Sequence, residues 1–441
     1  MKKQKNKNFD KIALLGLGKD NLELLKIFDK NKAPLDITIC DFRDINILPK
    51  HKLRNLKINY QLKEKFNQDL QHFDILFRSP GWPLSCPGIR SAQKKNPEIK
   101  ISSALNFFME TCPSKNIIGV TGTKGKGTTA TLIYNILKNS SNRKYQTFLG
   151  GNIGISPLSF LSKIKSQDWI ILELSSFQLE DLSFSPKIAV ITNLFKEHLQ
   201  PADPNNPNYH PSFEKYWQAK LNIVGKNNQH LIANEKLKRK IEKYIKNKKV
   251  IYFSTTTLPS KLVGNYNKEN IAAATAVARL LKIEPEIYQK TISQFKNLNH
   301  RLELVAKKNG VCYFDNSFST TPESTALDLE SFSGRIIQIA GGADKGASFE
   351  KLAKKIKSKT HLLILLPGPG SEKIKLALNK IKFPKNKIRH ASSMAEAVKV
   401  ATQEAQAKDT VLLSTGCASF GIFKNYKERG DLFQHYVKNE K

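Results

Sequence analysis

Cysteine is scarce in this 441-residue chain, and the cysteines lie far apart. They form no Cys-x-x-Cys pair and their number is odd: Cys40, Cys86, Cys112, Cys312 and Cys417. Such dispersed cysteines argue against a disulfide-bonded framework and are typical of reduced thiols inside a cell. We therefore expect a cytoplasmic protein.

Long apolar runs are also missing. The first residues, MKKQKNKNFDKIALLGLG, begin with basic side chains, but the apolar run after them is too short for a signal peptide and is better explained as a first strand. No other stretch approaches the length of about 20 apolar residues that spans a bilayer. We expect no membrane insertion.

Acidic residues are few relative to basic ones. The chain has 38 Asp and Glu against 72 Lys and Arg, which gives a formal net charge of +34. A basic surplus of this size can indicate nucleic acid, an anionic membrane or anionic substrates as partners. The lysines are scattered, however, and no zinc finger, aromatic RNA-binding motif or basic tail is present. A lysine-rich solvated surface without a specific nucleic-acid partner is the favoured interpretation.

The length and the hydrophobic content of 40% predict about two to four domains with proper cores. Strand and helix patterns alternate along the whole chain, which predicts α/β domains with parallel sheets. We expect three in series: a Rossmann-like domain over residues 1–111, a central P-loop ATPase-like domain over 112–298, and a second Rossmann-like domain over 299–441.

The first domain opens with a βαβ pattern. The strand Lys11–Leu15 runs into the turn Gly16–Asn21, a helical stretch follows, and a second strand, Asp36–Cys40, ends at Asp41. An acidic residue after the second strand is typical of dinucleotide-binding folds. Because Asn21 stands where the third glycine of that fingerprint belongs, we do not expect a classical NAD site.

The central domain opens on the glycine-rich turn Gly119–Thr129, GVTGTKGKGTT, which lies between a short apolar strand and a helical pattern. Such a turn presents backbone N–H groups and a positive helix end to phosphate. Lys126 can reach the outer phosphates, and the hydroxyl of Thr128 or Thr129 can face Mg²⁺. The spacing departs from the strict Walker pattern.

Two buried strands, Trp169–Leu174 and Lys187–Thr192, follow in the same domain. Glu173 near the end of the first and His198 shortly after the second are expected beside the phosphate loop, since ligands bind at the carboxyl ends of parallel strands. Together they could hold Mg²⁺ on a nucleotide. The alternative, that they form a partly buried pair with a structural role only, stays open. Taken alone, Lys220 in its apolar helix would be a snorkelling lysine.

The rest of the chain contains two asparagines in an alanine-rich helix and then a series of alternating strands and helices. Asn267 and Asn270 open an alanine-rich helix, where they could read a purine edge or act as caps. Strands at Arg335–Ala340, His361–Leu366 and Thr410–Leu413 then alternate with amphipathic helices, which predicts another parallel, doubly wound unit.

Several motifs together identify the chain as resembling the Mur ligases, the ATP-dependent enzymes that build the peptidoglycan stem peptide. The most specific is the run LELSSFQLE from Leu172. The others are TGTKGKGTT from Thr121, GGNIG from Gly150, the segment 193–198, YWQAKL around Lys220, NHRLE from Asn299, GGADKG from Gly341 and CASFGIFKNYKERGDLF from Cys417. These motifs cover the chain almost from end to end.

The resemblance implies specific site residues. Catalysis would rest on Lys126, Glu173, His198 and Lys220, and magnesium would be held by Thr128, Glu173, His198 and Lys220 as a carbamate. The ATP site would comprise Gly122, Thr123, Lys124, Gly125, Lys126, Gly127, Thr128, Asn267, Asn270, Arg301 and Asp315. The substrate site would comprise Asp41, Ser79, Gly81, Asn152, Ser175, Gln178, His198, Thr320, Lys345, Ser419, Phe420 and Tyr426.

The implied activity is ATP-dependent addition of glutamate to UDP-N-acetylmuramoyl-L-alanine through an acyl phosphate, by a monomer in cytoplasmic peptidoglycan precursor synthesis. The first domain would hold the uridine diphosphate, the second ATP and the third glutamate. D-glutamate is preferred and the L-glutamate-adding ligase is the alternative. From another class, a nucleic-acid-binding protein that retains the fold is the less favoured alternative.

Three positions depart from the family pattern. Gly127 stands where most members place a hydroxyl, so Thr128 must substitute for it. Asn316 stands where an aspartate usually precedes Ser317, and Phe318 stands where D-glutamate-adding members carry a lysine that contacts the substrate. The run STTPE from Ser319 is similar to that of L-glutamate-adding members, so these residues bear on the handedness of glutamate.

Overall fold

The computed structural model describes residues 10–31, 35–48, 53–140, 144–199, 208–225, 228–246, 248–344 and 346–439. Lys345, expected in the glutamate pocket, lies outside them. The chain divides into two compact units: the first unit is Met1–Ser254 with Ala272–Tyr288, and the second unit is Thr255–Ile271 with Gln289–Lys441. The division falls within helices α8 (Asn265–Leu280) and α9 (Pro285–Gln294).

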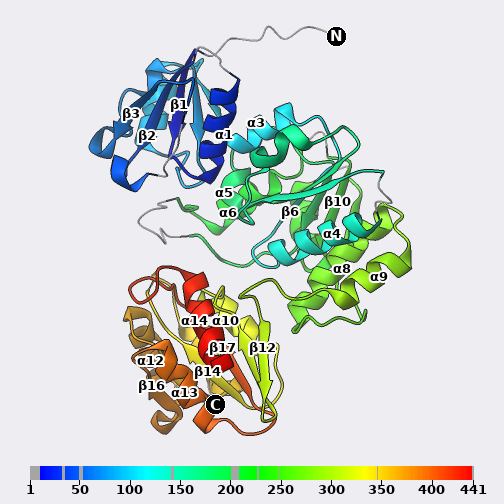
Figure 1. Cartoon of the computed structure of the whole chain (residues 1–441), viewed down its shortest axis with the longest axis vertical. Coiled ribbons are helices and arrows are strands. Elements are labelled where there is room, and N and C mark those ends of the chain that lie inside the picture. The colour runs from blue at the N-terminus through cyan, green and yellow to red at the C-terminus, as the bar shows by residue number, and fades with distance from the viewer. Residues whose placement is uncertain are drawn as a thin grey trace. The chain divides into compact units, whose positions relative to one another are not determined.

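The first sheet of the first unit is parallel throughout, with strand order β3-β2-β1-β4-β5. Its strands are β1 (Lys11–Leu15), β2 (Asp36–Asp41), β3 (Ile58–Leu62), β4 (Ile75–Arg78) and β5 (Lys100–Ser102), and its helices are α1 (Lys19–Lys30), α2 (Pro87–Lys95) and α3 (Ala104–Thr111) (Figure 1). The side chain of Asn21 is fully buried, and its amide donates to the carbonyls of Gly16 (2.9 Å) and Phe77 (3.1 Å). The residue in the place of the third glycine therefore fastens α1 to the ends of two strands.

The second sheet of the first unit is also parallel, with order β11-β10-β9-β6-β8-β7. Its strands are β6 (Ile117–Thr121), β7 (Thr147–Gly151), β8 (Trp169–Glu173), β9 (Ile188–Ile191), β10 (His230–Asn234) and β11 (Val250–Phe253). The helices are α4 (Lys126–Ser140), α5 (Ser176–Leu179), α6 (Phe213–Leu221) and α7 (Lys238–Tyr244). The central strands are mostly apolar and almost entirely buried, as expected when both faces of a parallel sheet are covered.

One hydrophobic core joins the two sheets of the first unit. Leu14 of β1, Phe108 of α3 and Leu172 of β8 belong to the same buried cluster. Phe108 meets the edge of Phe160 with ring centroids 6.2 Å apart. The first unit therefore packs as one body despite having two sheets.

The second unit carries a sheet of order β12-β13-β17-β14-β15-β16. Its elements are β12 (Glu303–Lys308), β13 (Val311–Asp315), β14 (Ile336–Ala340), β15 (Thr360–Leu365), β16 (Ile388–His390), β17 (Thr410–Leu413), α10 (Pro322–Leu329), α11 (Glu350–Lys359), α12 (Pro369–Lys380), α13 (Met394–Glu404) and α14 (Tyr426–Asn439) (Figure 1). The edge strand β12 is antiparallel to β13, so the expectation of parallel strands alone was incomplete. Asn309 and Gly310 both have positive φ and form the tight hairpin that reverses the chain.

No helix in the described ranges is both long and apolar enough to cross a membrane.

Candidate active site

The glycine-rich loop lies between β6 and α4, as the sequence predicted. Gly122 and Gly125 have φ of +145° and +76°, and a Cβ at Gly122 would collide with the hydroxyl of Thr192. Glycine is therefore required at the first turn of the loop. The loop delivers Lys126, the first residue of α4, and then Thr128, which is buried at 8% exposure.

Residues at the end of β9 hold this loop in shape. Thr192 donates its hydroxyl to the carbonyl of Lys124 (2.6 Å), and the Asn193 side chain accepts from the backbone N–H of Lys124 (2.7 Å). The N–H of Thr123 in turn donates to the carbonyl of Asn193 (3.0 Å). Sequence reasoning did not single out Thr192, and it noted Asn193 only as the start of a family motif. Their role in the loop is a pairing across about 70 residues of chain rather than a local pattern.

Two lysines converge on one carbonyl oxygen of the loop. Lys126 Nζ donates to Gly122 O at 3.0 Å, and Lys220 Nζ of α6 donates to the same atom at 2.8 Å. Lys220 is 1% exposed, and its ammonium lies 4.5 Å from the ring centroid of Tyr216. Burial and then the charge of Lys126 lower the pKa of Lys220 well below its usual value, and nearby carboxylates oppose this only in part.

Glu173 ends β8 beside the loop and is 2% exposed. Its Oε1 accepts from the amide of Asn152 (2.8 Å), which joins two predicted site residues. Its Oε2 is buried without a hydrogen-bond partner among the described residues. A buried carboxylate oxygen without a donor is costly unless a ligand satisfies it. Together with the buried hydroxyl of Thr128, this oxygen fits a hard cation such as Mg²⁺.

His198 follows β9 in a left-handed conformation, with φ of +59°. Its ring lies 5.0 Å from that of Phe177 and 6.1 Å from that of Tyr216. His198 therefore reaches the same aromatic cluster that covers Lys220, although its side chain is 40% exposed. The structure brings Lys126, Glu173, His198 and Lys220 to one end of the second sheet.

His210, which the sequence did not single out, is buried behind this cluster. It stacks on Phe177, with ring centroids 4.8 Å apart at 6°, and its Nε2 lies 2.9 Å from Ser176 Oγ. Burial, with the charges of His198 and Lys220, lowers the pKa of His210 to about 4. The ring is therefore neutral near pH 7.

The predicted substrate residues Ser175 and Gln178 form a capping box on α5. Ser175 Oγ accepts from the N–H of Gln178 (3.2 Å), and Gln178 Oε1 accepts from the N–H of Ser175 (3.1 Å). This reciprocal pair explains the local sequence, since it satisfies two N–H groups at the start of a helix.

A cavity of about 460 Å³ opens at the carboxyl ends of the strands of the first sheet, and Asp41, Arg43, Ser79, Gly81, Trp82 and Cys86 are among the residues that line it. Asp41 is fully buried and already accepts from Leu17 N–H (2.8 Å) and from Arg43 (2.7 Å). Burial acts against the carboxylate, but the bonds from Arg43 and Leu17 still hold the pKa of Asp41 below its usual value. The positive side chain presented near this cavity is therefore Arg43.

In the second unit, two loops bring predicted site residues together. Gly416 N–H donates to Ser319 O (3.2 Å), so the segment that holds Thr320 lies beside the one that holds Ser419 and Phe420. Phe318 meets the edge of Tyr426, with ring centroids 5.1 Å apart.

Asn267 and Asn270 are buried in the second unit, and their amides are engaged within it. Asn267 donates to Val263 O (2.7 Å), and Asn270 donates to Asn267 Oδ1 (2.9 Å). These bonds are packing contacts within the unit, and neither is a helix cap in which a side-chain oxygen accepts from a free N–H. Their contact with a nucleotide stays a prediction.

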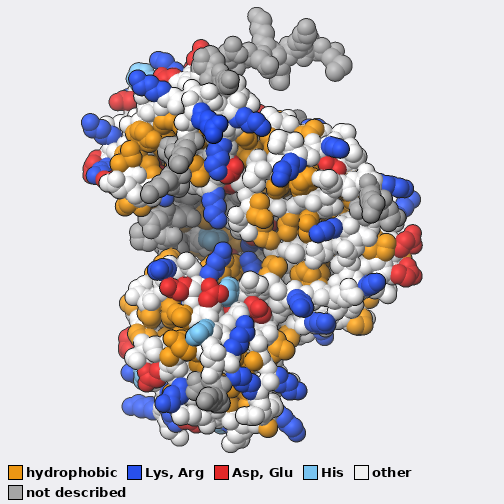
Figure 2. All heavy atoms as spheres, in the orientation of Figure 1, with side chains coloured by type: hydrophobic (Ala, Val, Ile, Leu, Met, Phe, Trp, Pro, Cys, Tyr) orange, Lys and Arg blue, Asp and Glu red, His pale blue; other side chains and the backbone are white. Residues whose placement is uncertain are grey.

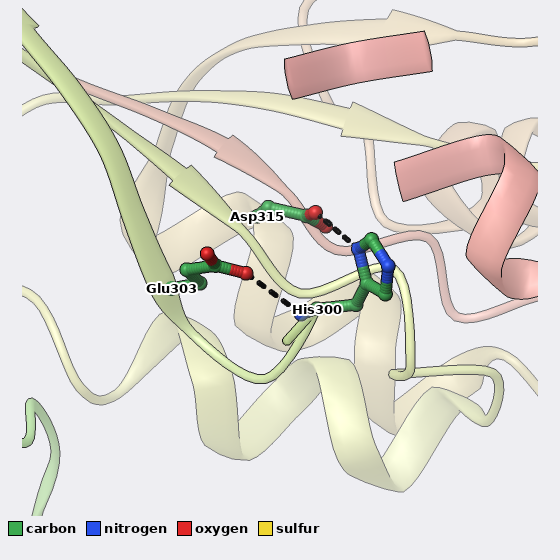
Figure 3. A group of neighbouring side chains, drawn as sticks. All are labelled: His300, Glu303 and Asp315. Carbon is green, nitrogen blue, oxygen red and sulfur yellow. Dashed lines mark hydrogen bonds and ion pairs between the residues drawn. The ribbon is translucent and has the colours of Figure 1, made fainter. Parts of the chain in front are cut away.

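Figure 3 shows a cluster of His300, Glu303 and Asp315 whose ligand atoms are close enough to hold a metal ion. Donors already occupy these atoms: His300 Nδ1 lies 2.7 Å from Asp315 Oδ2, and Gln434 donates to both Glu303 and Asp315 at 3.0 Å. Burial disfavours the charged ring, but the hydrogen bond and charge of Asp315 outweigh it and raise the pKa of His300. The cluster is thus a satisfied ion-pair network, and the contact of Asp315 with ATP stays a prediction.

Known proteins resemble this chain over almost its whole length. The Mur ligase middle domain matches residues 120–258, and the Mur ligase glutamate ligase domain matches residues 300–417. The UDP-N-acetylmuramoylalanine–D-glutamate ligase of Acetivibrio thermocellus is 35% identical, with 99% of this chain and 97% of that protein covered. The ligase of the same name from Clostridium tetani is 33% identical, with 97% and 96% covered.

Solved structures agree on the fold. The UDP-N-acetylmuramate-alanine ligase of Thermotoga maritima gives a TM-score of 0.57 at 16% identity, covering 98% of this chain and all of that one (100%). The MurF ligase of the same organism, in complex with ADP, gives 0.58 at 16% identity, with 98% and 95% covered. With the matches to both domains and the relatives above, these findings show that the chain belongs to the Mur ligase family.

Proposed function

We propose that this protein is an ATP-dependent ligase that joins D-glutamate to UDP-N-acetylmuramoyl-L-alanine in peptidoglycan precursor synthesis. The relatives that carry this activity in their names align from end to end at 30–35% identity. The observation that carries the proposal is the meeting of Lys126, Lys220 and Glu173 around the glycine-rich loop. The ADP bound to a related solved ligase supports ATP as the nucleotide.

The loop and Lys126 would hold the phosphates. Backbone N–H groups at the start of α4 and the ammonium of Lys126 offer positive charge where the phosphate groups would lie. Lys126 now donates to the carbonyls of Gly122 and Thr123 at 3.0 Å each. It must exchange these bonds for phosphate oxygens, which are stronger acceptors because they are charged.

Glu173, Thr128, His198 and a modified Lys220 would hold Mg²⁺, with Glu173 offering its unpartnered Oε2. When bound, Mg²⁺ would neutralise charge on the phosphates. Glu173 also orients Asn152 through its other oxygen, so one carboxylate would serve both the metal and the substrate side.

Lys220 would act as a carbamate. Its lowered pKa raises the fraction of neutral amine, which can add to CO₂ and release one proton to give an N-carboxylate. In the present form the amino groups of Lys126 and Lys220 share one carbonyl oxygen, and the charge of Lys126 disfavours a second ammonium there. The carbamate reverses the charge of Lys220, so the repulsion from Lys126 becomes an attraction and the site gains two oxygen ligands for magnesium.

The proposed reaction has two steps. The carboxylate of UDP-N-acetylmuramoyl-L-alanine takes the γ-phosphoryl group of ATP, which breaks the β–γ bridge and leaves ADP and an acyl phosphate. The amine of glutamate then attacks the acyl carbon, phosphate leaves, and the amine loses a proton. The protein groups mainly position the reactants and offset charge, as expected for phosphoryl transfer.

The handedness of glutamate has a second candidate. Phe318 and the run STTPE from Ser319 favour L-glutamate, whereas the relatives' names favour D-glutamate. The proposed glutamate pocket is Lys345, Ser419, Phe420 and Tyr426, with the first-sheet cavity for the uridine diphosphate. In this proposal the uridine substrate binds to residues 1–111, ATP to residues 112–298 and glutamate to residues 299–441.

The test is phosphate release by the purified chain with ATP, magnesium and UDP-N-acetylmuramoyl-L-alanine, and with each enantiomer of glutamate in turn. We expect release only when all substrates are present, with D-glutamate several-fold faster. A preference for L-glutamate would reverse the choice of substrate, and no release with either would remove the proposal.

A matched series tests the role of Lys220. Lys220→Ala should be nearly inactive and should regain part of its activity with added acetate, because a small carboxylate can fill the space of the carbamate. Added ethylamine should restore nothing. The control is Lys187→Ala. Lys187 lies at the opposite end of the same sheet, where it donates to Asn116 (3.0 Å), so this variant should stay active with or without acetate.

A further inference from the structure

Arg301 in the second unit lies against an aromatic ring that the family pattern does not provide. Its guanidinium carbon is 3.6 Å from the ring centroid of Phe318, which is a close cation–π contact. The rings of Phe318 and Tyr426 form a T-shaped pair, with centroids 5.1 Å apart at 86°. The Phe318 ring therefore contacts both a guanidinium and a second aromatic ring.

The backbone around this contact is held in an unusual conformation. His300 and Leu302, which flank Arg301, both have left-handed φ, of +60° and +49°. Side chains disfavour this region, and such residues persist where the surroundings over-determine them, often at functional sites. Here the His300–Asp315 bond of 2.7 Å and the bond from Phe318 N–H to His300 O (3.1 Å) hold the turn.

The backbone next to Phe318 is fixed by hydrogen bonds of Ser317. Ser317 donates its hydroxyl to Tyr426 O (2.7 Å) and accepts from the buried Arg429 (2.9 Å), and its N–H donates to Asp315 (2.8 Å). The chain neighbour of Phe318 is therefore fixed in place, while Phe318 itself stays 39% exposed. Within the described ranges Arg301 makes no ion pair, so its charge stays available for an anion.

We propose that Phe318 is a positioning residue that holds the guanidinium of Arg301 in place for the nucleotide. This inference rests on the proposed function and on the contact of Arg301 with ATP that the family resemblance implies. A phenyl ring places no charge beside Arg301, whereas a lysine at this position would repel it at the observed distance. The exchange of lysine for phenylalanine then also changes how Arg301 is held.

The experiment measures the affinity of a non-hydrolysable ATP analogue, and the KM values for ATP and glutamate, in variants of the full chain. Loss of a part-exposed cation–π contact corresponds to a change of about two- to fivefold in an equilibrium constant. We expect Phe318→Leu to weaken analogue binding and to raise the KM for ATP by that factor. Phe318→Trp should restore both, and Phe318→Lys should be weaker than Phe318→Leu. Leu376→Ala, an exposed position on α12, is the surface control.

A double-mutant cycle separates positioning from a general effect. In an Arg301→Met background, Phe318→Leu should cause no further loss of analogue affinity, because the group that it holds is gone. Equal affinity of the wild-type, Phe318→Leu and Phe318→Lys proteins would overturn the inference. So would a rise in the KM for glutamate without any change in analogue affinity. Because analogue binding requires no turnover, failure of the ligase reaction in the wild-type protein is a separate outcome.

Discussion

At the scale of single residues, the site contains buried polar and charged groups whose partners within the described residues are incomplete. Lys126 and Lys220 both donate to Gly122 O, and Glu173 keeps one buried oxygen without a described donor. Each of these arrangements costs folding free energy in the ligand-free protein. Such costs are typical of sites whose final partner is a ligand or a modification.

The buried amine of Lys220 makes stability and activity respond in opposite directions. We expect Lys220→Met to lose activity while its melting temperature at pH 7 equals or exceeds that of the wild type. The folded-state pKa of Lys220 is lowered, and the unfolded-state pKa is about 10.4. Between these values the unfolded chain binds the extra proton, so wild-type stability rises with pH and the advantage of the variant shrinks.

Thermal unfolding at pH 7, 8.5 and 10 in CO₂-free buffer measures this difference. Lys187→Met is the matched control, and the difference between its melting temperature and that of the wild type should not shrink as the pH rises. If the wild type and Lys220→Met kept a constant difference across this range, the assigned lowering of the pKa would be wrong.

Glu173→Gln tests the carboxylate directly. Glutamine can still accept from Asn152, so the fold should be kept, but the negative charge is lost. Charge stabilisation by a bound metal ion is worth several kcal/mol, so we expect kcat/KM to fall about 100-fold or more, with a higher magnesium concentration for half-maximal rate. Glu110→Gln, which changes a carboxylate 3.7 Å from Lys100, is the control and should behave as wild type. Near-full turnover of Glu173→Gln at saturating magnesium would contradict the assignment.

At the scale of elements, Arg78 at the end of β4 joins the two sheets of the first unit. It is 1% exposed, donates to Phe177 O and Trp82 O (2.8 Å each), and pairs with Glu180 and Asp181 at 3.2 Å. Removing one partner of a buried ion pair leaves the other charges uncompensated, at a cost of about 3–5 kcal/mol.

We therefore expect Arg78→Met to lower the free energy of unfolding by about 3–5 kcal/mol, measured by urea denaturation of the whole chain. The exposed Arg90 on α2 supplies the control, since Arg90→Met should change stability by less than about 0.5 kcal/mol. Equal stability of the two variants would show that Arg78 does not join the sheets.

The elements that could be predicted from the sequence are those with continuous apolar runs. Strands β1 and β17 have the predicted bounds, and β8, β9 and β14 differ from theirs by one or two residues. Two of the missed strands lack such runs: β3 (Ile58–Leu62) is part-exposed along its length, and β5 (Lys100–Ser102) has three residues. The strands β10, β11 and β13 were also missed, although they do contain apolar runs. The antiparallel edge strand could have been found, because Asn309-Gly310 is a strong hairpin signal.

Some residues of the candidate site could also be predicted from local sequence patterns, and others could not. The loop and Glu173 could be placed from local pattern, because a glycine turn and a strand end have periodic signatures. Lys220 could not, since its meaning comes from burial beside Lys126, far away in the chain. Arg78 and His210 likewise act through partners distant in sequence, and only the fold reveals them.

At the scale of the whole molecule, the net charge of +34 is the feature least used by the proposed chemistry. Figure 2 shows Lys and Arg side chains over every part of the chain that its view displays, with Asp and Glu side chains between them in several places. A scattered distribution attracts polyanions by releasing counterions and carries no sequence readout.

We expect any binding of nucleic acid to be non-specific and to weaken steeply between about 50 and 200 mM salt, as counterion release requires. Fluorescence anisotropy with two unrelated duplexes and one single strand measures both properties. Tight binding of one sequence that persists at high salt would instead favour the nucleic-acid-binding alternative.

The central claim is that ATP activates the carboxylate of the muramoyl substrate before glutamate attacks it. Its most direct test uses UDP-N-acetylmuramoyl-L-alanine with both carboxylate oxygens labelled with ¹⁸O, together with ATP, magnesium and D-glutamate. One labelled oxygen should appear in each phosphate released, because the carboxylate oxygen that attacks the γ-phosphorus leaves with it. Phosphate without label, or phosphate released equally well when glutamate or the muramoyl substrate is omitted, would contradict the account.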